Sequence, residues 1–263
     1  MLEIHAKTQE FPMRFTHRKI LITGGNSGIG KALAEALQAR GNRIIITGRK
    51  QAALTQVLKD NPDMAGYVLD VTDSQSMAEF LDNMRVDHPD LDGVILNAGI
   101  MEAEDYAADV VSTEVADRTI ATNLIAPIHL AAALLPHLRS RPEAALVTVS
   151  SGLAFVPRAE NPVYSATKAA IHSWSQSLRH QLRNTSVAVY EIAPPLVATE
   201  LTPGQSTWEQ ALPLDAFVHE VVEIMSQEHV PEEILVQRVN FLRNAERENR
   251  FASAFAAING QAL

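Results

Sequence analysis

Short apolar runs alternate with longer amphipathic segments along the chain, and this alternation restricts the fold more than any other feature. The runs are rich in Val, Ile and Leu without regular polar positions, which is typical of parallel strands that helices bury on both faces. We expect strands at residues 19–23, 43–47, 66–69, 93–96, 145–150 and 187–192. The intervening segments are long enough for right-handed helical crossovers. The sequence therefore predicts an α/β fold, a doubly wound Rossmann-type parallel sheet in a three-layer α/β/α arrangement.

The amphipathic segments give the expected helices and the tail. They span residues 29–40, 50–59, 74–85, 112–139, 163–183 and 214–227. Residues 232–239 fit a last strand or the start of a helix, and residues 240–258 have a helical pattern with a charged, solvated face at 246–250. We interpret residues 1–263 as a single domain, with a substrate loop near 198–212 and a helical C-terminal tail.

Composition excludes several classes of function. The chain has no cysteine, which removes disulfides, thiolate nucleophiles and thiolate metal sites. The histidines, including His129, His172 and His180, lack the spacing of metal ligands, so we interpret them as structural or exposed and expect no metal site. A net charge of −9 disfavours a nucleic-acid surface. No unbroken apolar stretch reaches the ~18 residues of a membrane span, and residues 1–19 lack an apolar signal core, so we expect a cytoplasmic protein.

A glycine-rich turn follows the first expected strand. It reads Thr23-Gly24-Gly25-Asn26-Ser27-Gly28-Ile29-Gly30 and opens the first helix. Gly24 permits a tight turn, Gly28 lets the backbone approach a pyrophosphate, and Gly30 allows close packing of the helix. The helix N-terminus adds amide donors and a positive dipole end. The turn therefore predicts a dinucleotide site.

Tyr164 and Lys168 lie four residues apart on an expected helix, which places phenol and ammonium on one face. A neighbouring ammonium stabilises the phenolate, and we expect it to draw the pKa of the tyrosine from ~10 toward neutral pH. Tyr164 then exchanges a proton with an alcohol or a carbonyl oxygen. Taken alone, the pair could equally be a solvated surface pair.

The motifs together resemble the short-chain dehydrogenase/reductase superfamily, in its single-domain branch, over about residues 18 to 200. They are the Gly-x-x-x-Gly-x-Gly turn, Leu96-Asn97-Ala98-Gly99, Thr122-Asn123, Val149-Ser150-Ser151 and Tyr-x-x-x-Lys, in family order. Finer details look like the DltE-like oxidoreductase subgroup: Gly41-Asn42, Thr47-Gly48-Arg49, Asn61-Pro62, Asn97-Ala98-Gly99-Ile100 and Ala193-Pro194-Pro195-Leu196-Val197.

The resemblance implies a catalytic set of Asn123, Ser151, Tyr164 and Lys168. Tyr164 is the acid/base, Ser151 stabilises the substrate oxygen, and Lys168 holds the nicotinamide ribose and lowers the tyrosine pKa. Ser150 is the alternative to Ser151. Asn123 is expected to kink its helix and to hold a water that leads to Lys168; alternatively it is a buried amide bonded to backbone.

The resemblance also implies a cofactor site. Its residues are Thr23, Gly24, Asn26, Ser27, Gly28, Ile29, Gly30, Arg49, Asp70, Val71, Asn97, Ala98, Gly99, Tyr164, Lys168, Pro194, Val197 and Thr199. Gly48 stands where NAD enzymes carry a carboxylate, and the Arg49 guanidinium suits a 2′-phosphate, so we expect NADP (NADPH) rather than NAD. Arg49 could instead stack on adenine or face solvent, and Asp70 could cap the helix near Ser74 instead of meeting the adenine.

Substrate recognition is the least specific part of the pattern. Pro195 replaces the glycine that many relatives carry, so we expect an altered loop geometry beside the nicotinamide. The expected pocket neighbours are Met101, Glu102, Leu153, Phe155, Arg158, Leu196 and Trp208. Arg158 could bind a substrate carboxylate or phosphate, or it could be a surface charge.

The resemblance implies an NAD(P)-dependent oxidoreductase that transfers a hydride between a nicotinamide cofactor and a small-molecule carbonyl or alcohol substrate. The alternative is a cofactor-binding sensor protein without turnover. The small and apolar residues on the helices that carry Asn123 and Tyr164 are compatible with the family's helix-to-helix contact, so we expect a homodimer or homotetramer.

Overall fold

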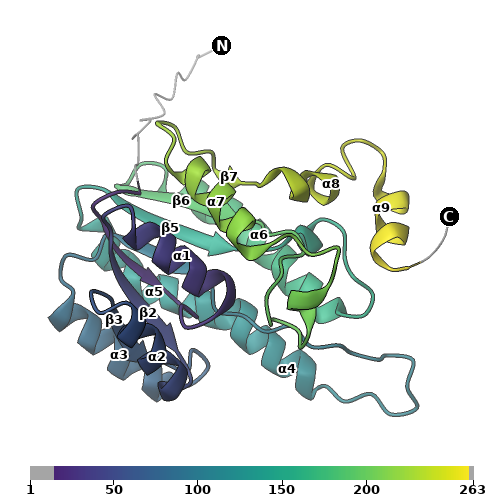
Figure 1. The fold of residues 1–263 in the computed structure, drawn as a ribbon, viewed down its shortest axis with the longest axis horizontal. Helices are drawn as coiled ribbons and strands as arrows, with labels where there is room; N and C mark the ends of the chain where they lie inside the picture. Colours follow the sequence, from purple (N-terminus) through teal and green to yellow (C-terminus); the bar gives the residue numbers. More distant parts are fainter. Residues whose placement is uncertain (1–14, 261–263) are drawn as a thin grey trace.

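A computed structural model of the chain describes residues 15–260. In these residues a parallel sheet lies between two layers of helices, as Figure 1 shows. Its strands are β1 (Lys19–Ile22), β2 (Arg43–Gly48), β3 (Ala65–Val68), β4 (Gly93–Leu96), β5 (Ala144–Val149), β6 (Val187–Ile192) and β7 (Glu233–Ile234), in the order β3-β2-β1-β4-β5-β6-β7. Strand order reverses between β1 and β4, where doubly wound sheets bind their ligands. The predicted fold class is confirmed.

The helices follow the predicted ranges closely. They are α1 (Gly28–Gln38), α2 (Gln51–Asp60), α3 (Ser74–Asp87), α4 (Glu114–Ile120), α5 (Ala126–Arg139), α6 (Pro162–Leu182), α7 (Leu214–Met225), α8 (Asn240–Arg243) and α9 (Phe251–Ile258). A π-helical turn, Ala121–Ile125, joins α4 to α5. The predicted helix at 112–139 is therefore interrupted at Asn123.

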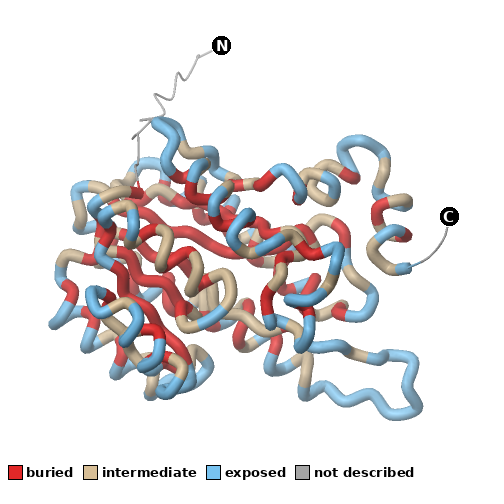
Figure 2. The backbone as a smooth tube through the Cα atoms, in the orientation of Figure 1, coloured by how far each residue is buried: buried red, intermediate tan, exposed pale blue. Residues whose placement is uncertain are grey.

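Each face of the sheet has its own apolar core, and Figure 2 shows the strands buried between them. Ile20 points to the core under α1 and α7, where Leu37 and Phe217 also lie. Leu21, the next residue, points to the opposite core with Leu134 of α5. Consecutive side chains on a strand face opposite sides, and both sides are covered, so apolar residues occupy successive positions.

The C-terminal tail differs from the prediction of one helix over residues 240–258. The chain forms the short helix α8, then turns over residues 244–250, and resumes as α9. Asn249 has a φ of +55°, a left-handed conformation that asparagine adopts more readily than most residues, and a helix cannot continue through it. The Arg250 amide donates to the Ala245 carbonyl at 2.7 Å across this turn. The charged residues 246–250 thus lie in a turn, not on a helical face.

The helical region Glu114–Arg139 is long and apolar enough, by length and composition alone, to cross a membrane. In this fold, however, its α5 part lies against the sheet. Leu130, Leu134 and Leu138 belong to the core that also holds Leu146 of β5. These contacts explain the apolar composition as that of a helix that covers a sheet.

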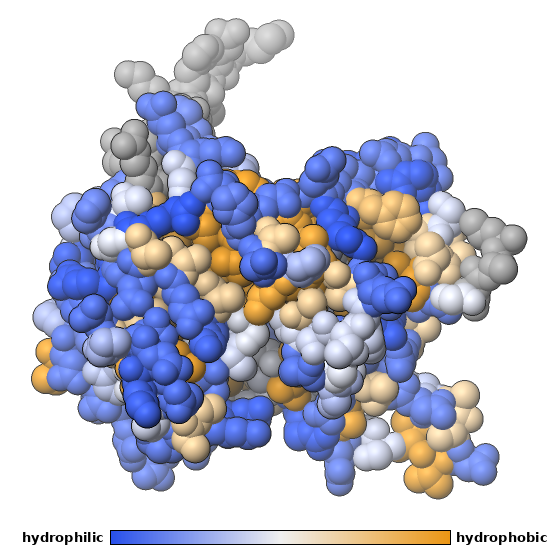
Figure 3. Space-filling model, viewed as in Figure 1, coloured by the Kyte–Doolittle hydropathy of each residue, from blue (hydrophilic) through white to orange (hydrophobic). Residues whose placement is uncertain are grey.

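The loop over residues 103–112 projects beside α4, as Figures 1 and 2 show. Tyr106, Val110 and Val111 on this loop are exposed. Figure 3 shows apolar side chains gathered at its tip, away from the body of the protein. Apolar surface of this kind is common where proteins meet partners.

Candidate active site

A cleft of about 620 Å³ opens at the carboxyl ends of the strands. It joins the turns after β1 to β6, as expected for an open α/β sheet. Every residue of the predicted catalytic and cofactor sets lines it except two, Thr23 and Asn123, which lie behind its wall. The cleft also includes residues that the sequence did not single out for the site: Thr47, Ala53, Leu69, Ile100, Thr122, Glu200, Leu201, Pro203 and Gln205.

The glycine turn packs too tightly for side chains at its key positions. Gly28 has a φ of +52°. A Cβ on Gly30 would lie 2.4 Å from both the Asn97 amide nitrogen and the Gly24 carbonyl oxygen. The turn is therefore held against the end of β4, with the N-terminus of α1 facing the cleft.

Thr23 and Asn97 fix this turn by hydrogen bonds. The Thr23 hydroxyl accepts from the Asn97 and Ala98 amides at 3.0 and 3.1 Å. The Asn97 side-chain amide donates to the Thr23 carbonyl at 2.9 Å. Thr23 is buried and does not line the cleft, so in this structure it shapes the turn through these hydrogen bonds.

Arg49 and Asp70 lie in the part of the cleft that the turns after β2 and β3 form. Arg49 is exposed on the turn after β2, and its charge helps to lower the pKa of Asp70. Hydrogen bonds from Thr72 are the larger cause of that lowered pKa: Asp70 accepts from the Thr72 amide at 2.9 Å and from its hydroxyl at 2.7 Å. Asp73, rather than Asp70, caps α3, by accepting from the amides of Gln75 and Ser76. Asp70 thus keeps its place on the cleft wall.

Gly48 has no room for the acid that its position carries in NAD enzymes. A Cβ on Gly48 would lie 2.5 Å from the side chain of Asn26. The glycine is therefore part of the packing between β2 and the glycine turn.

Tyr164 and Ser151 meet near the end of β5. Both side chains are buried, and the Ser151 hydroxyl lies near enough to the Tyr164 phenol to act on its pKa. Ser151 also accepts from the Leu153 amide at 3.1 Å. Burial raises the pKa of Tyr164 to about 12, against the smaller lowering effect of Ser151.

This direction is the reverse of the predicted one, and the surroundings of Lys168 give the reason. Lys168 is also buried, and loss of water lowers its own pKa to about 8. Its Nζ lies 5.5 Å from the centre of the Tyr164 ring and donates to the Val149 carbonyl at 2.8 Å. Burial penalises both charged forms more than the two groups help each other.

Asn123 sits in the π turn, directly behind the cleft. Its side-chain oxygen accepts from the Ile100 amide at 2.9 Å, and its side-chain nitrogen donates to the Ile100 carbonyl at 2.8 Å. The interruption of the helix matches the prediction, while the side chain behaves as the alternative, a buried amide bonded to backbone. It holds the segment after β4 against the helix.

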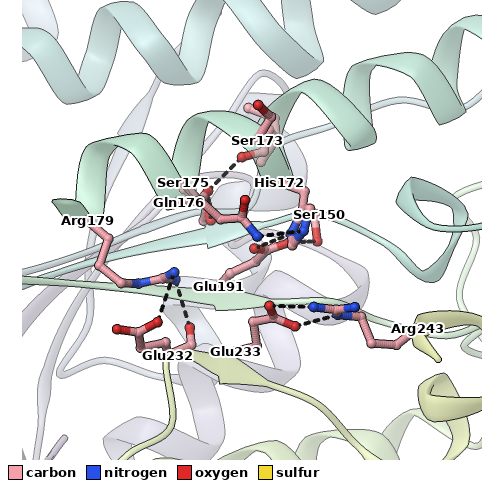
Figure 4. Close-up of polar contacts among 12 residues, drawn as sticks. Ser150, His172, Ser173, Ser175, Gln176, Arg179, Glu191, Glu232, Glu233 and Arg243 are labelled. Carbon is pink, nitrogen blue, oxygen red and sulfur yellow. Dashed lines mark hydrogen bonds and ion pairs between the residues drawn. The ribbon is translucent and has the colours of Figure 1, made fainter. Parts of the chain in front are cut away.

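Ser150 also lines the cleft, but its hydroxyl is engaged elsewhere. Its hydroxyl donates to the buried Glu191 on β6, and Glu191 also bonds to the His172 ring at 2.8 Å (Figure 4). Glu191 was not among the predicted functional residues, and His172 was expected to be structural or exposed. A lone acid inside the apolar strand 187–192, and a histidine four residues after Lys168, were the signals available.

The segment after β6 folds back over the cleft. The Leu212 amide donates to the Leu196 carbonyl at 2.9 Å, and the Ala198 amide donates to the Leu212 carbonyl at 2.8 Å, so the loop is closed at its base. Gln205, buried on this loop, donates from Nε2 to the Val197 carbonyl at 2.8 Å. The loop contributes Glu200, Leu201, Pro203 and Gln205 to the cleft wall, beside Pro194 and Pro195.

Only part of the predicted substrate pocket lines the cleft. Met101 and Glu102 do, whereas Leu153, Phe155, Arg158, Leu196 and Trp208 do not. Arg158 pairs with Glu160, and its guanidinium lies 5.6 Å from the Trp208 ring. These partners favour the structural alternative for Arg158.

Comparison with known proteins identifies the family. A model of the short chain dehydrogenase family matches residues 18–210. The uncharacterized oxidoreductase DltE of Bacillus subtilis is 38% identical over 253 residues, which cover 95% of this chain and 99% of that protein.

Solved structures agree on the fold. A short chain dehydrogenase from Burkholderia cenocepacia in complex with NADP has a TM-score of 0.80 at 22% identity, covering 94% of this chain and 99% of that one. A closed form of serine dehydrogenase complexed with NADP+ has a TM-score of 0.73 at 26% identity, covering 82% and 92%. With its glycine turn, its kinked helix and its buried Tyr164–Lys168 pair at one end of a parallel sheet, this chain belongs to the DltE-like group of the short-chain dehydrogenase/reductase superfamily of nicotinamide-dependent oxidoreductases.

Proposed function

We propose that this protein is an NADP-dependent oxidoreductase that interconverts a small carbonyl compound and its alcohol, with Tyr164 as acid/base. The observation that carries the proposal is the meeting of Ser151, Tyr164 and Lys168 at the end of β5, inside a cleft built to hold a dinucleotide. A protein that only sensed the cofactor has no chemical need for this set.

The cleft fits the cofactor in shape and in donor chemistry. Its volume of about 620 Å³ lies in the range of ligand sites, and bare glycine backbone with a helix N-terminus forms one wall. Among residues 15–260, the buried Oε1 of Gln205 has no hydrogen-bond donor. A ligand with amide or hydroxyl donors, such as a nicotinamide nucleotide, suits such an atom.

The bound cofactor supplies or takes a hydride at C4 of its nicotinamide. In reduction, Tyr164 gives its phenolic proton to the substrate oxygen while the Ser151 hydroxyl donates a hydrogen bond to that oxygen. The high pKa of about 12 keeps Tyr164 protonated, ready to act as an acid. The Lys168 ammonium stabilises the phenolate that forms and binds the ribose hydroxyls. Oxidation follows the same steps in reverse.

Preference for NADP rests on the part of the cleft at the end of β2. Arg49 offers a guanidinium there, and Gly48 leaves no carboxylate to bind a free ribose diol. The NADP complexes among the structural relatives support this choice.

Three further properties belong to the proposal. We expect residues 1–263 to act as one domain in the cytoplasm, and as a homodimer or homotetramer. Ile120 and Ile125 are exposed at the ends of α4 and of the π turn, and this apolar surface supports an interface between two copies of the chain at that helix.

The test is turnover with and without the phenol. Purified protein and Tyr164→Phe are assayed for NADPH oxidation against a panel of aldehydes and ketones, and each is titrated with NADPH by nicotinamide fluorescence. We expect Tyr164→Phe to bind NADPH normally and to lose about 10²- to 10⁴-fold in rate. Equal rates in the wild type and Tyr164→Phe would show that Tyr164 is not the acid/base. If the wild type binds NADPH but reduces no member of the panel, the sensor alternative is favoured.

A further inference from the structure

Glu191 is a carboxylate with no exposed surface, placed in the otherwise apolar strand β6. A buried charge is stable only if partners replace the water that it loses. Glu191 has two such partners, shown in Figure 4: the Ser150 hydroxyl, and the His172 Nδ1 at 2.8 and 3.0 Å from its two oxygens. These two partners hold the carboxylate in place, and the proposed proton and hydride transfers do not involve it.

The first partner joins Glu191 to the reaction centre. Ser150 lies between Val149, whose carbonyl accepts from Lys168, and Ser151, whose hydroxyl lies near the Tyr164 phenol. Three consecutive residues at the end of β5 thus contact the lysine, the buried carboxylate and the tyrosine in turn. The residue that contacts Glu191 is therefore adjacent in the chain to the residue that contacts Lys168 and to the residue that contacts Tyr164.

The second partner extends the same line along α6. Tyr164, Lys168, His172 and Gln176 are spaced by four residues and share one face of the helix. His172 Nε2 lies 3.0 Å from Gln176 Nε2, on the exposed side of the helix. The face that begins with the acid/base pair therefore continues, one turn later, with the side chain that holds Glu191.

Two buried charges of opposite sign thus lie in one cluster. Burial lowers the pKa of Lys168 to about 8, and the negative charge of Glu191 acts against that lowering. Without a counter-charge, a buried lysine loses its proton at still lower pH. Lys168 must keep its proton to stabilise the Tyr164 phenolate, so the counter-charge bears on the reaction.

Arg243 and Glu233 form an ion pair beside this cluster. Arg243 on α8 forms two hydrogen bonds with Glu233 on β7, at 2.6 and 2.9 Å, and lies over the Phe155 ring at 4.7 Å. Phe155 in turn packs edge-on against His172 at 4.9 Å. Tyr164 is neutral below a pH of about 12. Glu233 is the main partner of Arg243, which the negative charge of Glu191 also stabilises; on β6 and α6, Glu191 and His172 are the groups of the cluster beside Lys168.

We propose that Glu191 is a positioning residue of the active site, whose buried carboxylate is the counter-charge that keeps Lys168 protonated while Ser150 and His172 hold it in place. The inference rests on the proposed function for the role of Lys168 in turnover. The electrostatic coupling itself requires no substrate and no cofactor.

The test measures the proton on Lys168 directly. The chain has only six lysines, so protein labelled with ¹³C at lysine Cε gives few NMR signals, and Lys168→Met assigns the one that matters. We expect the Lys168 signal to titrate with a midpoint near pH 8 in the wild type. In Glu191→Gln we expect a midpoint about one pH unit lower, which corresponds to a tenfold lower proton affinity. Glu143→Gln is the matched control, because it removes the same charge at the opposite end of β5, where Arg18 keeps Asp92 as a partner.

An unchanged midpoint in Glu191→Gln, or an equal fall in Glu143→Gln, overturns the proposal. If Glu191→Gln does not fold, Glu191→Asp and Glu191→Asn replace it. These two variants leave similar space and differ in charge, so a lower Lys168 midpoint in the asparagine variant supports the proposal and equal midpoints overturn it. Because this readout does not depend on turnover, absence of enzymatic activity would count against the proposed function without affecting the result.

Discussion

The Lys168 ammonium donates a 2.8 Å hydrogen bond to the Val149 carbonyl, so the lysine is fixed to the end of β5 rather than free to approach the Tyr164 ring, 5.5 Å away. A backbone carbonyl cannot move without the strand. The hydrogen bond therefore fixes the position of the lysine ammonium relative to the Tyr164 ring.

Reduction should slow as the pH rises through about 8. Below that pH both Lys168 and Tyr164 hold their protons, because burial lowers the pKa of Lys168 to about 8 and raises that of Tyr164 to about 12. Above it Lys168 loses the charge that stabilises the phenolate. A profile of kcat/KM against pH reports this group in the free enzyme. Lys168→Arg keeps its charge and should move the decline to higher pH; a decline at the same pH in both proteins would assign it to another group.

Arg49→Ala should weaken NADPH binding by about 10- to 100-fold and leave NADH binding nearly unchanged, because only NADPH carries the 2′-phosphate that the guanidinium binds. Fluorescence titration with each nucleotide measures both affinities. Arg85→Ala, which removes an exposed arginine paired with Asp82 on α3, is the control for net charge. Equal losses for NADH and NADPH would show that Arg49 stacks on the adenine instead.

Gly48→Asp alone should not produce an NAD enzyme. The new side chain repels the phosphate of NADPH, but its Cβ would lie 2.5 Å from Asn26 and displace it from the glycine turn. We expect weaker binding of both nucleotides. Gly48→Asp with Asn26→Gly removes the collision and should recover NADH binding, measured by the same titration. Strong NADH binding by the single variant would contradict the packing argument.

Gly30→Ala should destabilise the protein by about 1–3 kcal/mol, because the added methyl meets Asn97 and the Gly24 carbonyl at 2.4 Å and the turn must shift. Gly204→Ala is the matched control: it strains a φ of +79° but has nothing within 4 Å, so about 1 kcal/mol is expected. Urea denaturation gives both values. A loss no greater for Gly30 than for Gly204 would show that the turn accommodates the methyl freely.

Most of the sheet was predictable because its strands are apolar on both faces. Runs such as 93–96 have one interpretation once helical segments flank them, and the structure places their ends within a residue or two. The shape of the C-terminal tail was not predictable, because the turn at Asn249 depends on a backbone conformation that the helical pattern of residues 240–258 does not reveal.

The positions of the reactive groups followed from their motifs, but their electrostatics did not. Spacing places Tyr164 beside Lys168, yet only the three-dimensional structure shows that both are buried and that burial dominates their pKa values. Likewise, the resemblance favours Ser151 over Ser150, but the sequence gives no physical reason for the choice. The distinction comes from Glu191, a residue 41 positions away that pairs with Ser150.

The contacts of Val149, Ser150 and Ser151 have a mechanical consequence. Lys168 and Tyr164 belong to α6 and Glu191 belongs to β6, and each contacts a successive residue at the end of β5, so this strand end joins the helix and the neighbouring strand at the site. A substitution that shifts the end of β5 should therefore disturb the lysine, the carboxylate and the tyrosine together.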